Sequence, residues 1–579
     1  MKFGVLALDY DGTIARDGVL DPEVKAAIVA ARARGIVVVI VTGRILSDLK
    51  QAAGDLGFVD AVVAENGAVL AFPSGQTWLI GHPPSQPFLD ELRRQGIEFK
   101  MGQSIVEAAA DSAPQILDVI RSLELPLVLL FNRSRLMILP QAISKGTGLR
   151  EALNVFRLSV HNAIAIGDAE NDHDLLAACE IAVAVGWGSA ALQKEADEIL
   201  QGDGPSAVAE YIQRAAQEMK LPRGQFARHR TLVGTAEDGR PIAPAVDGRN
   251  FLVVGDPQSG KSWASGLACE QMILQGYCLC VIDPEGDYGT LESLPGVVVL
   301  GGTDQPPEIP DVARALRHFD LSVVVDLSRI LYEDKVRYLK TLLPMLAELR
   351  RTTGLPHRIV VDEAHYFLHE PDVKQLLDFD LNAYSLVTYR PSDLHPDLRK
   401  DIQVVVAKRL TRPQEVQTLL TMVKNKGVEQ EWTAILAGLA DNEAVWLPGI
   451  EEAEGKLSCF KLLPRLTPHV RHKTKYLDVQ LAGGQEFVFT DNGQTIGPPA
   501  RSLKQFVLSL PNTPATSLAG HARRGDFSRW IEGVFHDHRL ASDVRKVEQR
   551  YRLGHLDDVR QSLARLIQDR YKFSHDKSM

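Results

Sequence analysis

The sequence predicts an α/β protein made of several domains. Its 579 residues are too many for a single domain. Short apolar runs typical of buried parallel strands alternate along most of the chain with stretches of helical periodicity. Three of these runs end in side chains that can handle phosphate, at Asp9, Thr42 and Asp168. Because the carboxyl ends of parallel strands meet at one edge of an open sheet, we expect these residues to share a site.

Composition and charge exclude some classes of protein. With 45% hydrophobic residues, a net charge of −10 and a mean hydropathy of −0.07, the chain resembles a globular protein and not a basic chain that coats nucleic acid. No run of about 18 apolar residues occurs, so no membrane span is predicted. The first 13 residues are expected to form a strand and not a signal peptide. Five cysteines in mostly apolar segments predict reduced core thiols and a cytoplasmic location.

The first phosphate-handling pattern is Asp9-Tyr10-Asp11-Gly12-Thr13, directly after the apolar run 3–8. Alternation along a strand places Asp9 and Asp11 on one side, although a simple turn is the alternative for this pentapeptide alone. Later segments of the chain favour a site. They contribute Thr42 after a second strand, Lys145 at the start of a helix, and Asp168, Asn171 and Asp172 after a third strand.

Together these residues supply a carboxylate nucleophile, a second acid, a hydroxyl and an ammonium for phosphate oxygens, and further carboxylates for a cation. Phosphate monoesters hydrolyse extremely slowly without a catalyst, so an enzyme needs charge neutralisation and a covalent relay. Mg²⁺ suits such a site because it prefers oxygen ligands and bridges carboxylates and phosphates. The pattern therefore predicts a phosphatase that uses Mg²⁺.

This order of motifs, with VTGR at 41–44 and GDAEND at 167–172, resembles the haloacid dehalogenase (HAD) superfamily. The stretch AENGAVL at 64–70 is similar to the Cof-type, sugar-phosphatase-like branch of that superfamily. The resemblance implies a Rossmann-like phosphatase domain over residues 1–220, with an inserted α/β cap near 73–143 that selects the substrate. The cap looks short, which fits a small or an unusually exposed substrate, and the expected substrate is a small phosphomonoester such as a sugar phosphate.

The resemblance also implies a role for each residue. Asp9 would be the nucleophile that forms a phosphoaspartate, and Asp11 would be the general acid and base. Thr42 and Lys145 would hold the phosphate. The implied ligands of Mg²⁺ are the side chains of Asp9 and Asp168 and the backbone carbonyl of Asp11, with Asp172 in support.

A second phosphate-binding pattern lies in NFLVVGDPQSGKSW, residues 250–263, where an apolar run leads into a G-x-x-x-x-G-K-S motif. In such a loop, backbone N–H groups and a helix N-terminus bind phosphates, and Gly255 and Gly260 would give the loop its shape. Lys261 would reach the β- and γ-phosphates of ATP, and Ser262 would bind Mg²⁺. A chance glycine-rich turn is the alternative.

The segment HRIVVDEAHYFL, residues 357–368, supplies a pair of acids at the end of another apolar run. Asp362 is expected to act on the nucleotide's metal, and Glu363 to polarise a water. This pair favours hydrolysis of ATP over transfer of its phosphate to an acceptor. An acidic pair that caps a helix is the alternative.

Two further stretches, VIDPEGDYGTL at 281–291 and LVTYRPSDLHPDL at 386–398, resemble segments of the HerA/FtsK group of P-loop ATPases. The alternation of apolar runs and helical stretches over residues 225–460 predicts a largely parallel sheet. The resemblance implies a RecA-like ATPase domain over these residues and assembly into a homo-oligomer such as a hexamer. Tyr389 stands where that group usually has a sensor glutamine.

Two arginines of the same region, Arg409 and Arg412, are candidates for an arginine finger that acts on a neighbouring subunit, with ordinary surface arginines as the alternative. The region lacks an obvious basic run interleaved with aromatic residues. The DNA activity of the HerA/FtsK group is therefore not carried over, and nucleic-acid binding is left open.

The C-terminal region, residues 464–579, is expected to hold a small β segment followed by a helical module. From Arg501 onward the sequence has 15 Lys/Arg against 9 Asp/Glu, a net charge of about +6. This excess fits either a solvated helix face or contact with an acidic partner. We expect an interaction or assembly module.

The sequence as a whole predicts a bifunctional protein, a Mg²⁺-dependent phosphatase fused to an ATP-hydrolysing ATPase. One alternative is a kinase–phosphatase that acts on a polynucleotide end or a sugar. Another is an ATPase machine associated with DNA. The adjacent acids at 362 and 363 favour hydrolysis, and the full set of phosphatase residues argues against an inactive first domain.

Overall fold

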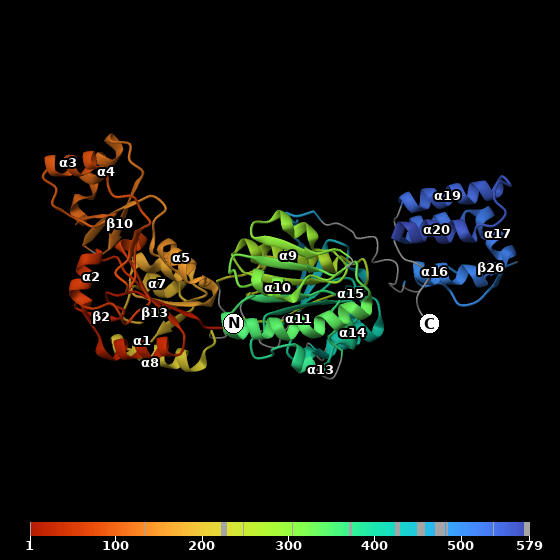
Figure 1. The fold of residues 1–579 in the computed structure, drawn as a ribbon, viewed down its shortest axis with the longest axis horizontal. Helices are drawn as coiled ribbons and strands as arrows, with labels where there is room; N and C mark the ends of the chain where they lie inside the picture. The colour runs from red at the N-terminus through yellow and green to blue at the C-terminus, as the bar shows by residue number, and fades with distance from the viewer. Residues whose placement is uncertain are drawn as a thin grey trace. The chain divides into compact units, whose positions relative to one another are not determined.

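The structure, a computed structural model, describes most of the chain. It covers residues 2–132, 134–221, 228–246, 248–303, 305–369, 373–422, 429–447, 458–468, 481, 485–491, 493–535 and 538–571. These residues form two compact units, one comprising Met1–Pro284 with Leu291–Thr467 and the other comprising Pro468–Met579 with Glu285–Thr290. The larger unit contains the three largest β-sheets, which Figure 1 shows in the red to cyan part of the ribbon.

The first sheet has eight strands, and its centre consists of parallel strands. In spatial order the strands are β14 (Glu198–Leu200), β13 (Ile181–Val185), β12 (Ala163–Gly167), β1 (Val5–Leu8), β4 (Val37–Val41), β5 (Ala61–Ala64), β6 (Val69–Ala71) and β7 (Thr77–Leu79). The first six are parallel, whereas β6 and β7 are antiparallel. Because β12, β1 and β4 are neighbours, the residues that follow them meet at one edge of the sheet.

Helices cover both faces of this sheet, as in an α/β domain. On one face, α5 (Lys145–Phe156) and α6 (His173–Ala178) pack against the apolar side chains of β1 and β4. On the other, α1 (Pro22–Ala33) packs against α8 (Pro205–Glu218), as Figure 1 shows. The side chain of Ser144 caps α5 by accepting a hydrogen bond from the backbone of Thr147, which fixes the start of this helix at Lys145.

An inserted α/β cap lies between β7 and α5 in the sequence. Its antiparallel strands are, in spatial order, β10 (Leu127–Asn132), β11 (Arg135–Pro140), β9 (Val106–Ala109) and β8 (Phe99–Met101), and its helices are α3 (Gln86–Arg94) and α4 (Ala113–Ser122). Apolar side chains at alternate strand positions, such as Leu136 and Ile138, pack against Phe88 and Ile116 of the helices. The cap therefore has a small core of its own.

The largest sheet has eleven strands and is mixed. Its seven parallel strands are, in spatial order, β23 (Val404–Ala407), β17 (Phe251–Val254), β22 (Tyr384–Thr388), β21 (Arg358–Val361), β18 (Leu279–Asp283), β20 (Ser322–Asp326) and β19 (Val297–Gly301). The antiparallel strands β24 (Glu443–Leu447), β25 (Ser458–Leu462), β15 (Gly234–Ala236) and β16 (Pro241–Ile242) extend the sheet beyond β23. This antiparallel extension qualifies the expectation of a largely parallel sheet. Within the extension, β15 pairs with β25, which comes more than 220 residues later in the chain.

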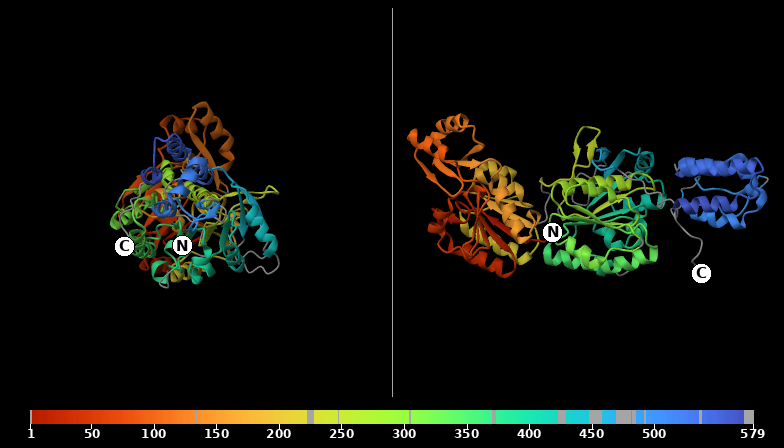
Figure 2. Two further views of the ribbon diagram at one scale, coloured as in Figure 1. Left: turned by 90° about the vertical axis from the view of Figure 1, so that its right-hand side faces the viewer. Right: turned by 45° about the horizontal axis from the view of Figure 1, so that its top comes forward.

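Helices also cover the eleven-stranded sheet. The longest, α11 (Tyr332–Thr353), buries Leu339, Leu342 and Leu346, spaced three and four residues apart, against the strands. The helix α9 (Lys261–Leu274) begins at the phosphate-loop motif and lies across the sheet from α11, as the two orientations in Figures 1 and 2 show. This part of the chain is a mixed α/β structure.

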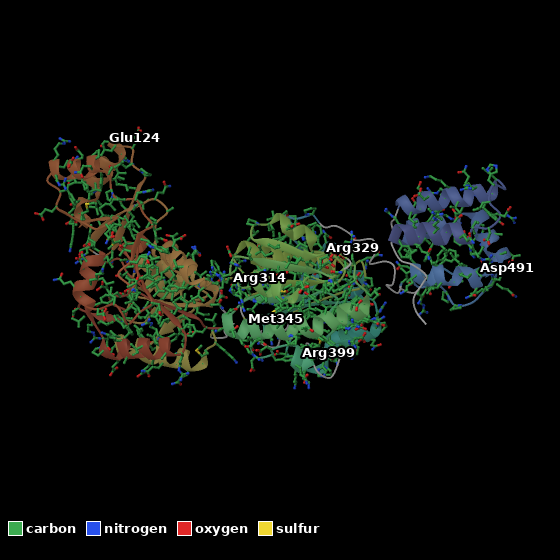
Figure 3. All side chains as sticks on the ribbon, viewed as in Figure 1. Glu124, Arg314, Arg329, Met345, Arg399 and Asp491 are labelled. Carbon is green, nitrogen blue, oxygen red and sulfur yellow. The ribbon has the colours of Figure 1, made fainter. Side chains whose placement is uncertain are left out.

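The smaller unit is mainly helical. It contains the hairpin β26 (Thr490–Asp491) and β27 (Gln494–Thr495), followed by α16 (Leu503–Ser509), α17 (Ala515–Arg524), α18 (Asp526–Trp530), α19 (His538–Arg552) and α20 (Arg560–Tyr571). Its core is rich in aromatic side chains, and Phe487 stacks on Phe527. Asp491, labelled in Figure 3, accepts a hydrogen bond from the Thr516 hydroxyl at 2.7 Å and joins the hairpin to α17. Much of the expected β segment, residues 469–480, lies outside the described residues.

Among the described residues, no helix combines the length and apolar character that crossing a membrane requires.

Candidate functional site

The three strand-end residues predicted to share a site, together with Lys145, do meet at one edge of the eight-stranded sheet. Asp9 follows β1 and is buried, and its Oδ1 lies 2.6 Å from Nζ of Lys145. The same Nζ lies 2.6 Å from Oδ1 of Asp172. A carboxylate oxygen from each of Asp9, Asp168 and Asp172 lies within 4.8 Å of the other two. The site therefore holds three buried carboxylates around one ammonium group.

The balance of charge in this site perturbs its pKa values. Burial and then the neighbouring carboxylate of Asp172 raise the pKa of Asp9 well above its ordinary value, although Lys145 opposes this shift. Burial alone would lower the pKa of Lys145, but the carboxylates of Asp172 and Asp9 outweigh burial and raise that pKa. One ammonium does not neutralise three carboxylates, so the site attracts further positive charge.

The loop after β12, which carries Asp168, approaches the loop of Gly12 closely. Oδ2 of Asp172 accepts hydrogen bonds from the N–H groups of Asp168 and Ala169, both at 3.0 Å, which folds the loop after β12 back on itself. Gly12 has a φ of +85°, and a Cβ there would lie 2.3 Å from Oδ2 of Asp168. Only glycine therefore lets the first acidic loop approach the carboxylate of Asp168.

The carboxylate of Asp11 faces an arginine. Nε and Nη2 of Arg44 donate to the two oxygens of Asp11, both at 2.6 Å, and form a bidentate pair. The Arg44 guanidinium also stands 5.2 Å from the ring centre of Tyr10. This pair fixes the orientation of the Asp11 carboxylate.

The cap contributes a side chain beside the predicted phosphate-holding residue Thr42. Thr42 follows β4, is buried, and accepts a hydrogen bond at Oγ1 from the N–H of Arg44 at 3.1 Å. A Cβ placed on the next residue, Gly43, would lie 3.0 Å from the terminal methyl of Met137 in β11 and 3.1 Å from Oδ1 of Asn66. Met137 therefore reaches from the cap to the edge of the sheet, and little space is left above Gly43.

A strained turn holds the cap to the sheet. Glu65 and Asn66 have φ values of +55° and +51°, a conformation that residues other than glycine rarely adopt. The buried carboxylate of Glu65 accepts hydrogen bonds from the N–H groups of Gln103 and Ser104, both at 2.9 Å, in the segment between β8 and β9. Backbone strain of this kind is usually retained where it serves a function.

The residues present fit Mg²⁺. Magnesium prefers oxygen ligands and is usually bound by one or two carboxylates together with phosphate and water. Asp9 and Asp168 offer buried carboxylates within one 4.8 Å cluster, and Asp172 adds a third. A divalent cation there would offset the charge that raises the pKa of Asp9.

Comparison with known proteins agrees with this arrangement. Residues 6–82 and 111–212 match the haloacid dehalogenase-like hydrolase family. The N-terminal domain is haloacid dehalogenase-like. The phosphoglycolate phosphatase of Methanosarcina acetivorans is 25% identical over 232 residues, which are 37% of this chain and 98% of that protein.

Two further proteins are similar to nearly the same share of the chain. The phosphoglycolate phosphatase of Natronomonas pharaonis is 29% identical over 222 residues, which are 36% of this chain and 96% of that protein. The crystal structure of a haloacid dehalogenase-like hydrolase from Bacteroides thetaiotaomicron is 19% identical and covers 37% of this chain and 99% of that one, with a TM-score of 0.32. The family match ends at residue 212, before the phosphate-loop motif.

The phosphate-loop motif lies between β17 and α9. Gly260 has a φ of +91° and directly precedes α9, whose first residues are Lys261 and Ser262. Nζ of Lys261 donates to the carbonyl of Asp256 within the loop at 3.1 Å. A Cβ on Gly255 would lie 2.5 Å from Oγ of Ser259, so the loop closes tightly on itself. The residues predicted to bind phosphate therefore form one compact loop at the start of a helix.

The acidic pair lies on a nearby strand of the same sheet. Asp362 and Glu363 follow β21, which is separated from β17 by β22, and both are buried. Glu363 has a φ of +45° and approaches Nδ1 of His365 at 3.6 Å. Burial lowers the pKa of His365 to about 4, and the nearby ammonium of Lys261 contributes to this shift. The acidic pair and the phosphate loop thus lie within electrostatic reach of each other.

Three cations surround the ring of Tyr389, which follows β22. Charged groups of Lys261, Arg390 and Arg412 stand 5.7, 5.2 and 5.6 Å from the ring centre. Cations on an aromatic face are stabilised by its quadrupole. Arg412, considered above for a role at a neighbouring subunit, therefore lies beside the phosphate loop of its own chain, and Arg409 approaches Asp441 at 4.0 Å.

Several residues of these sites are not identified by sequence reasoning. They are Arg44, Glu65, Asn66 and Met137 in the first site, and His365 and Arg390 in the second. Arg44 lies in VTGR, and Glu65 and Asn66 lie in AENGAVL, so all three are inside motifs that carry the family resemblance. Met137 carries no such signal, because its place depends on how the cap packs.

Proposed function

We propose that the N-terminal domain hydrolyses a small phosphomonoester through a phosphoaspartate. The observation that carries this proposal is the buried cluster in which Lys145 contacts Asp9 and Asp172 at 2.6 Å, with Asp168 beside them. A structural salt-bridge cluster would not need a third carboxylate, whose presence raises the electrostatic cost of the site. Perturbed, buried carboxylates at a sheet edge are typical of catalytic sites.

The roles follow from the chemistry of phosphate esters. A carboxylate oxygen of Asp9 attacks phosphorus, the P–O bond to the leaving alcohol breaks, and Asp11 donates its proton to that alcohol. Asp11, now ionised, then takes a proton from the water that attacks the phosphoaspartate, and the P–O bond to Asp9 breaks to release phosphate. Lys145 and the Thr42 hydroxyl bind the oxygens of the transferred group.

Asp9, Asp168 and the Asp11 carbonyl, with Asp172 in support, would hold Mg²⁺. The ion supplies charge neutralisation for the phosphoryl oxygens and carboxylates when it is bound. The residues themselves prepare the site, because hydrogen bonds from the loop backbone fix Asp172 and Lys145 links that carboxylate to the nucleophile.

Several features favour a small substrate. Met137 of the cap reaches Gly43, and Glu65 binds the cap segment that contains Gln103 and Ser104. The phosphoglycolate phosphatases that resemble this domain act, by their names, on a two-carbon phosphate ester. We therefore expect substrates such as phosphoglycolate or a short sugar phosphate, and a larger ester to be turned over less well.

The test is a phosphatase screen with the full-length protein in Mg²⁺. A panel of phosphoglycolate, sugar phosphates and nucleoside monophosphates is assayed for released phosphate with the wild type, Asp9→Asn and a control, Asp90→Asn, whose carboxylate is exposed on α3. We expect activity on at least one small ester, loss of about 10⁴-fold in Asp9→Asn, and no change in the control. Equal activity in wild type and Asp9→Asn would exclude the mechanism.

A second activity is proposed for the other part of the larger unit. We infer that the loop Gly255–Ser262 binds ATP and that Asp362 and Glu363 support its hydrolysis in a RecA-like domain. Three observations support this proposal. The loop closes tightly at the start of α9, and only β22 separates β17, which precedes the loop, from β21, which precedes the acidic pair. Three cations surround the ring of Tyr389. Cations near a helix N-terminus favour a polyanionic ligand.

ATP hydrolysis is tested with Lys261→Ala against the exposed control Lys340→Ala. We expect Lys261→Ala to lose ATP hydrolysis by about 10²–10³-fold and to keep phosphomonoesterase activity. Transfer of labelled γ-phosphate to a polynucleotide or sugar would support a kinase instead. A DNA-associated machine predicts stimulation by DNA, and a hexamer predicts a mass of six chains in solution.

A further inference from the structure

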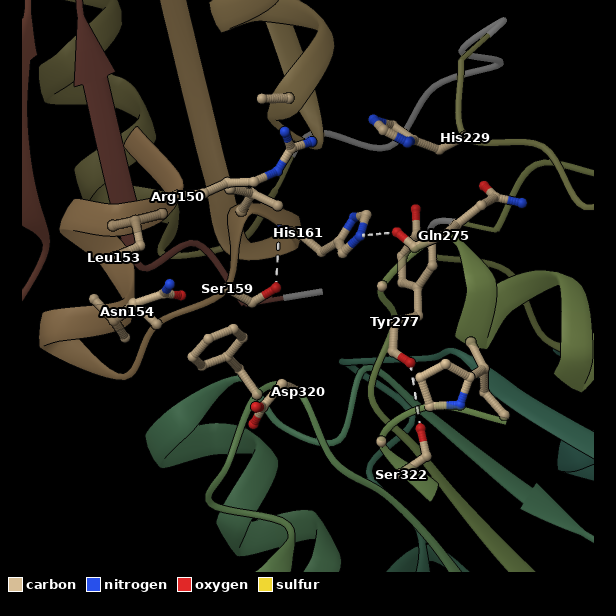
Figure 4. Close-up of a pocket in the computed structure, with 18 of the residues that line it drawn as sticks. Arg150, Leu153, Asn154, Ser159, His161, His229, Gln275, Tyr277, Asp320 and Ser322 are labelled. Atoms are coloured by element: carbon tan, nitrogen blue, oxygen red, sulfur yellow. Dashed lines mark hydrogen bonds between the residues drawn. The ribbon is translucent and has the colours of Figure 1, made fainter. Parts of the chain in front are cut away.

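A cluster of histidines and a glutamate lies apart from both phosphate sites. His161 precedes β12, Glu180 precedes β13, and His229 leads into the part of the chain that holds β15. One donor atom from each of the three lies within 4.8 Å of the other two. Figure 4 shows His161 and His229 directed toward one region beside Tyr277, at a cavity of about 380 Å³.

The hydrogen bonds of both rings fix which nitrogen is available. Nε2 of His161 lies 2.9 Å from the carbonyl of Gln275, and Nε2 of His229 lies 3.0 Å from the carbonyl of Cys179. A carbonyl oxygen only accepts, so each Nε2 donates its hydrogen and a neutral ring carries its lone pair on Nδ1. Histidines that bind metals typically donate their other N–H to a backbone carbonyl in this way.

That arrangement leaves one contact without an explanation. Nδ1 of His161 lies 2.7 Å from Oε2 of Glu180, although in the neutral ring both atoms carry lone pairs. Both side chains are buried. Either a second proton lies between these atoms, or both atoms face one metal cation as neighbouring ligands, and His229 supplies a further donor within the same cluster.

We propose that His161, Glu180 and His229 bind a divalent transition-metal ion of the zinc class. Two imidazoles and one carboxylate are a ligand set that zinc uses where a fourth position is left to water or an external ligand. Here the fourth position would face the cavity, which His161 and His229 both line.

Outer contacts also orient the ligands. The hydroxyl of Tyr277 donates to Glu180, at 2.8 Å from Oε2, and its ring stacks on His161 with ring centres 3.7 Å apart. His229 has a φ of +50°, which residues other than glycine adopt rarely and which aims its ring at the cluster. Such supporting contacts commonly change metal affinity by about 10–100-fold when they are removed.

The nearby positive charge is already compensated. Arg228 donates from Nε to Asp197 at 3.0 Å and from Nη2 to the carbonyls of Cys179 and Glu180 at 2.5 and 3.1 Å. Its Nη2 also lies 3.4 Å from Nε2 of His229. The guanidinium thus fixes the carbonyl of Cys179 that orients His229, and its charge is paired with a carboxylate.

The test measures zinc bound by the full-length protein, freed of metal with a chelator and then dialysed against equimolar Zn²⁺ in excess Mg²⁺, which competes with zinc for clusters of carboxylates such as Asp9, Asp168 and Asp172. We expect one zinc per chain. The variants Glu180→Gln and His229→Gln should bind at least about 10-fold more weakly. His173→Ala is the matched control, because that histidine also pairs with a carboxylate, Glu195, at 2.8 Å on the exposed surface.

Wild-type protein gives a second readout that does not depend on whether a variant folds. Co²⁺ should produce the visible absorption of a four-coordinate site, and equimolar Zn²⁺ should remove it. If wild type and His173→Ala bind no zinc and Co²⁺ gives no such absorption, the proposal is overturned, and the contact between His161 and Glu180 is an imidazolium–carboxylate pair. Phosphatase and ATPase assays have no part in this result, so failure of either proposed activity leaves it unchanged.

Discussion

The Asp9 site and the loop Gly255–Ser262 both lie at the carboxyl ends of parallel strands, but they present opposite charge. At the first, three carboxylates surround one ammonium, Lys145. At the second, Lys261 shares the ring of Tyr389 with two arginines, and the phosphate groups would meet backbone N–H groups. We therefore expect the first site to need a cation before it accepts a phosphate, and the loop, with three cations beside it, to depend less on one.

The two sites also differ in how the chain builds them. The loop Gly255–Ser262 is one continuous segment, so its geometry is set mostly by local sequence. The Asp9 site combines residues from position 9 to position 172, and its electrostatics exist only in the folded domain. A substitution in the first site should therefore disturb folding as well as activity, and one in the loop should disturb mainly activity.

The largest expected difference comes from replacing the two lysines by the same residue. In Mg²⁺-free buffer, Lys145→Met leaves buried carboxylates without their counter-ion and should lower the local free energy of unfolding by about 3–5 kcal/mol. Lys261→Met should cost about 1 kcal/mol, since it removes a hydrogen bond to the Asp256 carbonyl. Hydrogen exchange of peptides around β1 and α5, and around β17 and α9, measures each region separately.

Equal destabilisation of the two regions would contradict this view of the lysines. The exposed Lys340→Met serves as the control for loss of a lysine in general. Mg²⁺ should restore part of the protection lost in Lys145→Met, because a divalent cation also compensates the carboxylates.

The second-largest expected effect is a loss of ATP hydrolysis, confined to the site proposed at the loop Gly255–Ser262. Glu363→Gln keeps the shape of the side chain but removes its ability to take a proton, so ATP hydrolysis should fall by about 10²–10³-fold while ATP binding persists. Nucleotide binding and phosphate release are measured on the same protein. The phosphomonoesterase activity of the Asp9 site should not change. If Glu363→Gln hydrolysed ATP at the wild-type rate, this glutamate would have no part in the mechanism.

Magnesium and pH should act together on the first site. The folded pKa of Asp9 is raised, so its contribution to stability is full below the ordinary aspartate pKa and is lost as pH rises through the folded value. Mg²⁺ binds the ionised form, so its stabilising effect should grow with pH and approach about 2.7 kcal/mol at 100 times its Kd. Hydrogen exchange around β1 at pH 5 and pH 7.5, with and without Mg²⁺, measures this.

The control for that experiment is Asp168→Asn, which removes one proposed ligand and should reduce the effect of Mg²⁺ at both pH values. A Mg²⁺ effect of the same size at pH 5 and pH 7.5 would mean that the ion binds elsewhere or that Asp9 is already ionised at the lower pH.

The residues that sequence patterns predict well are those that follow strands. Asp9, Thr42 and Asp168 each end an apolar run, and the parallel order of β12, β1 and β4 brings them together. Met137 reaches the site only because the cap packs over Gly43, and nothing in its local sequence indicates that. The position of such a residue depends on tertiary packing, which periodicity does not encode.

Dependence on tertiary packing also explains why two other features are not predicted from the sequence. The strand β15 pairs with β25 across more than 220 residues, and the cluster of His161, Glu180 and His229 combines three separate segments. Single histidines in apolar or loop segments give no sequence signal, whereas ligands with fixed short spacing would.

The smallest predicted effect concerns Trp187, which is half-buried after β13 and donates its indole N–H to the carbonyl of Gly12 at 2.8 Å. Trp187→Phe keeps the aromatic ring but removes this hydrogen bond from the loop that carries Asp11. The loss should cost about 1 kcal/mol, or about fivefold in kcat/KM for the phosphomonoester. Trp78→Phe, on the exposed strand β7, is the matched control and should leave kcat/KM unchanged. A loss above about 100-fold would mean that Trp187 touches the substrate itself, since a single neutral hydrogen bond to the backbone does not account for so large a change.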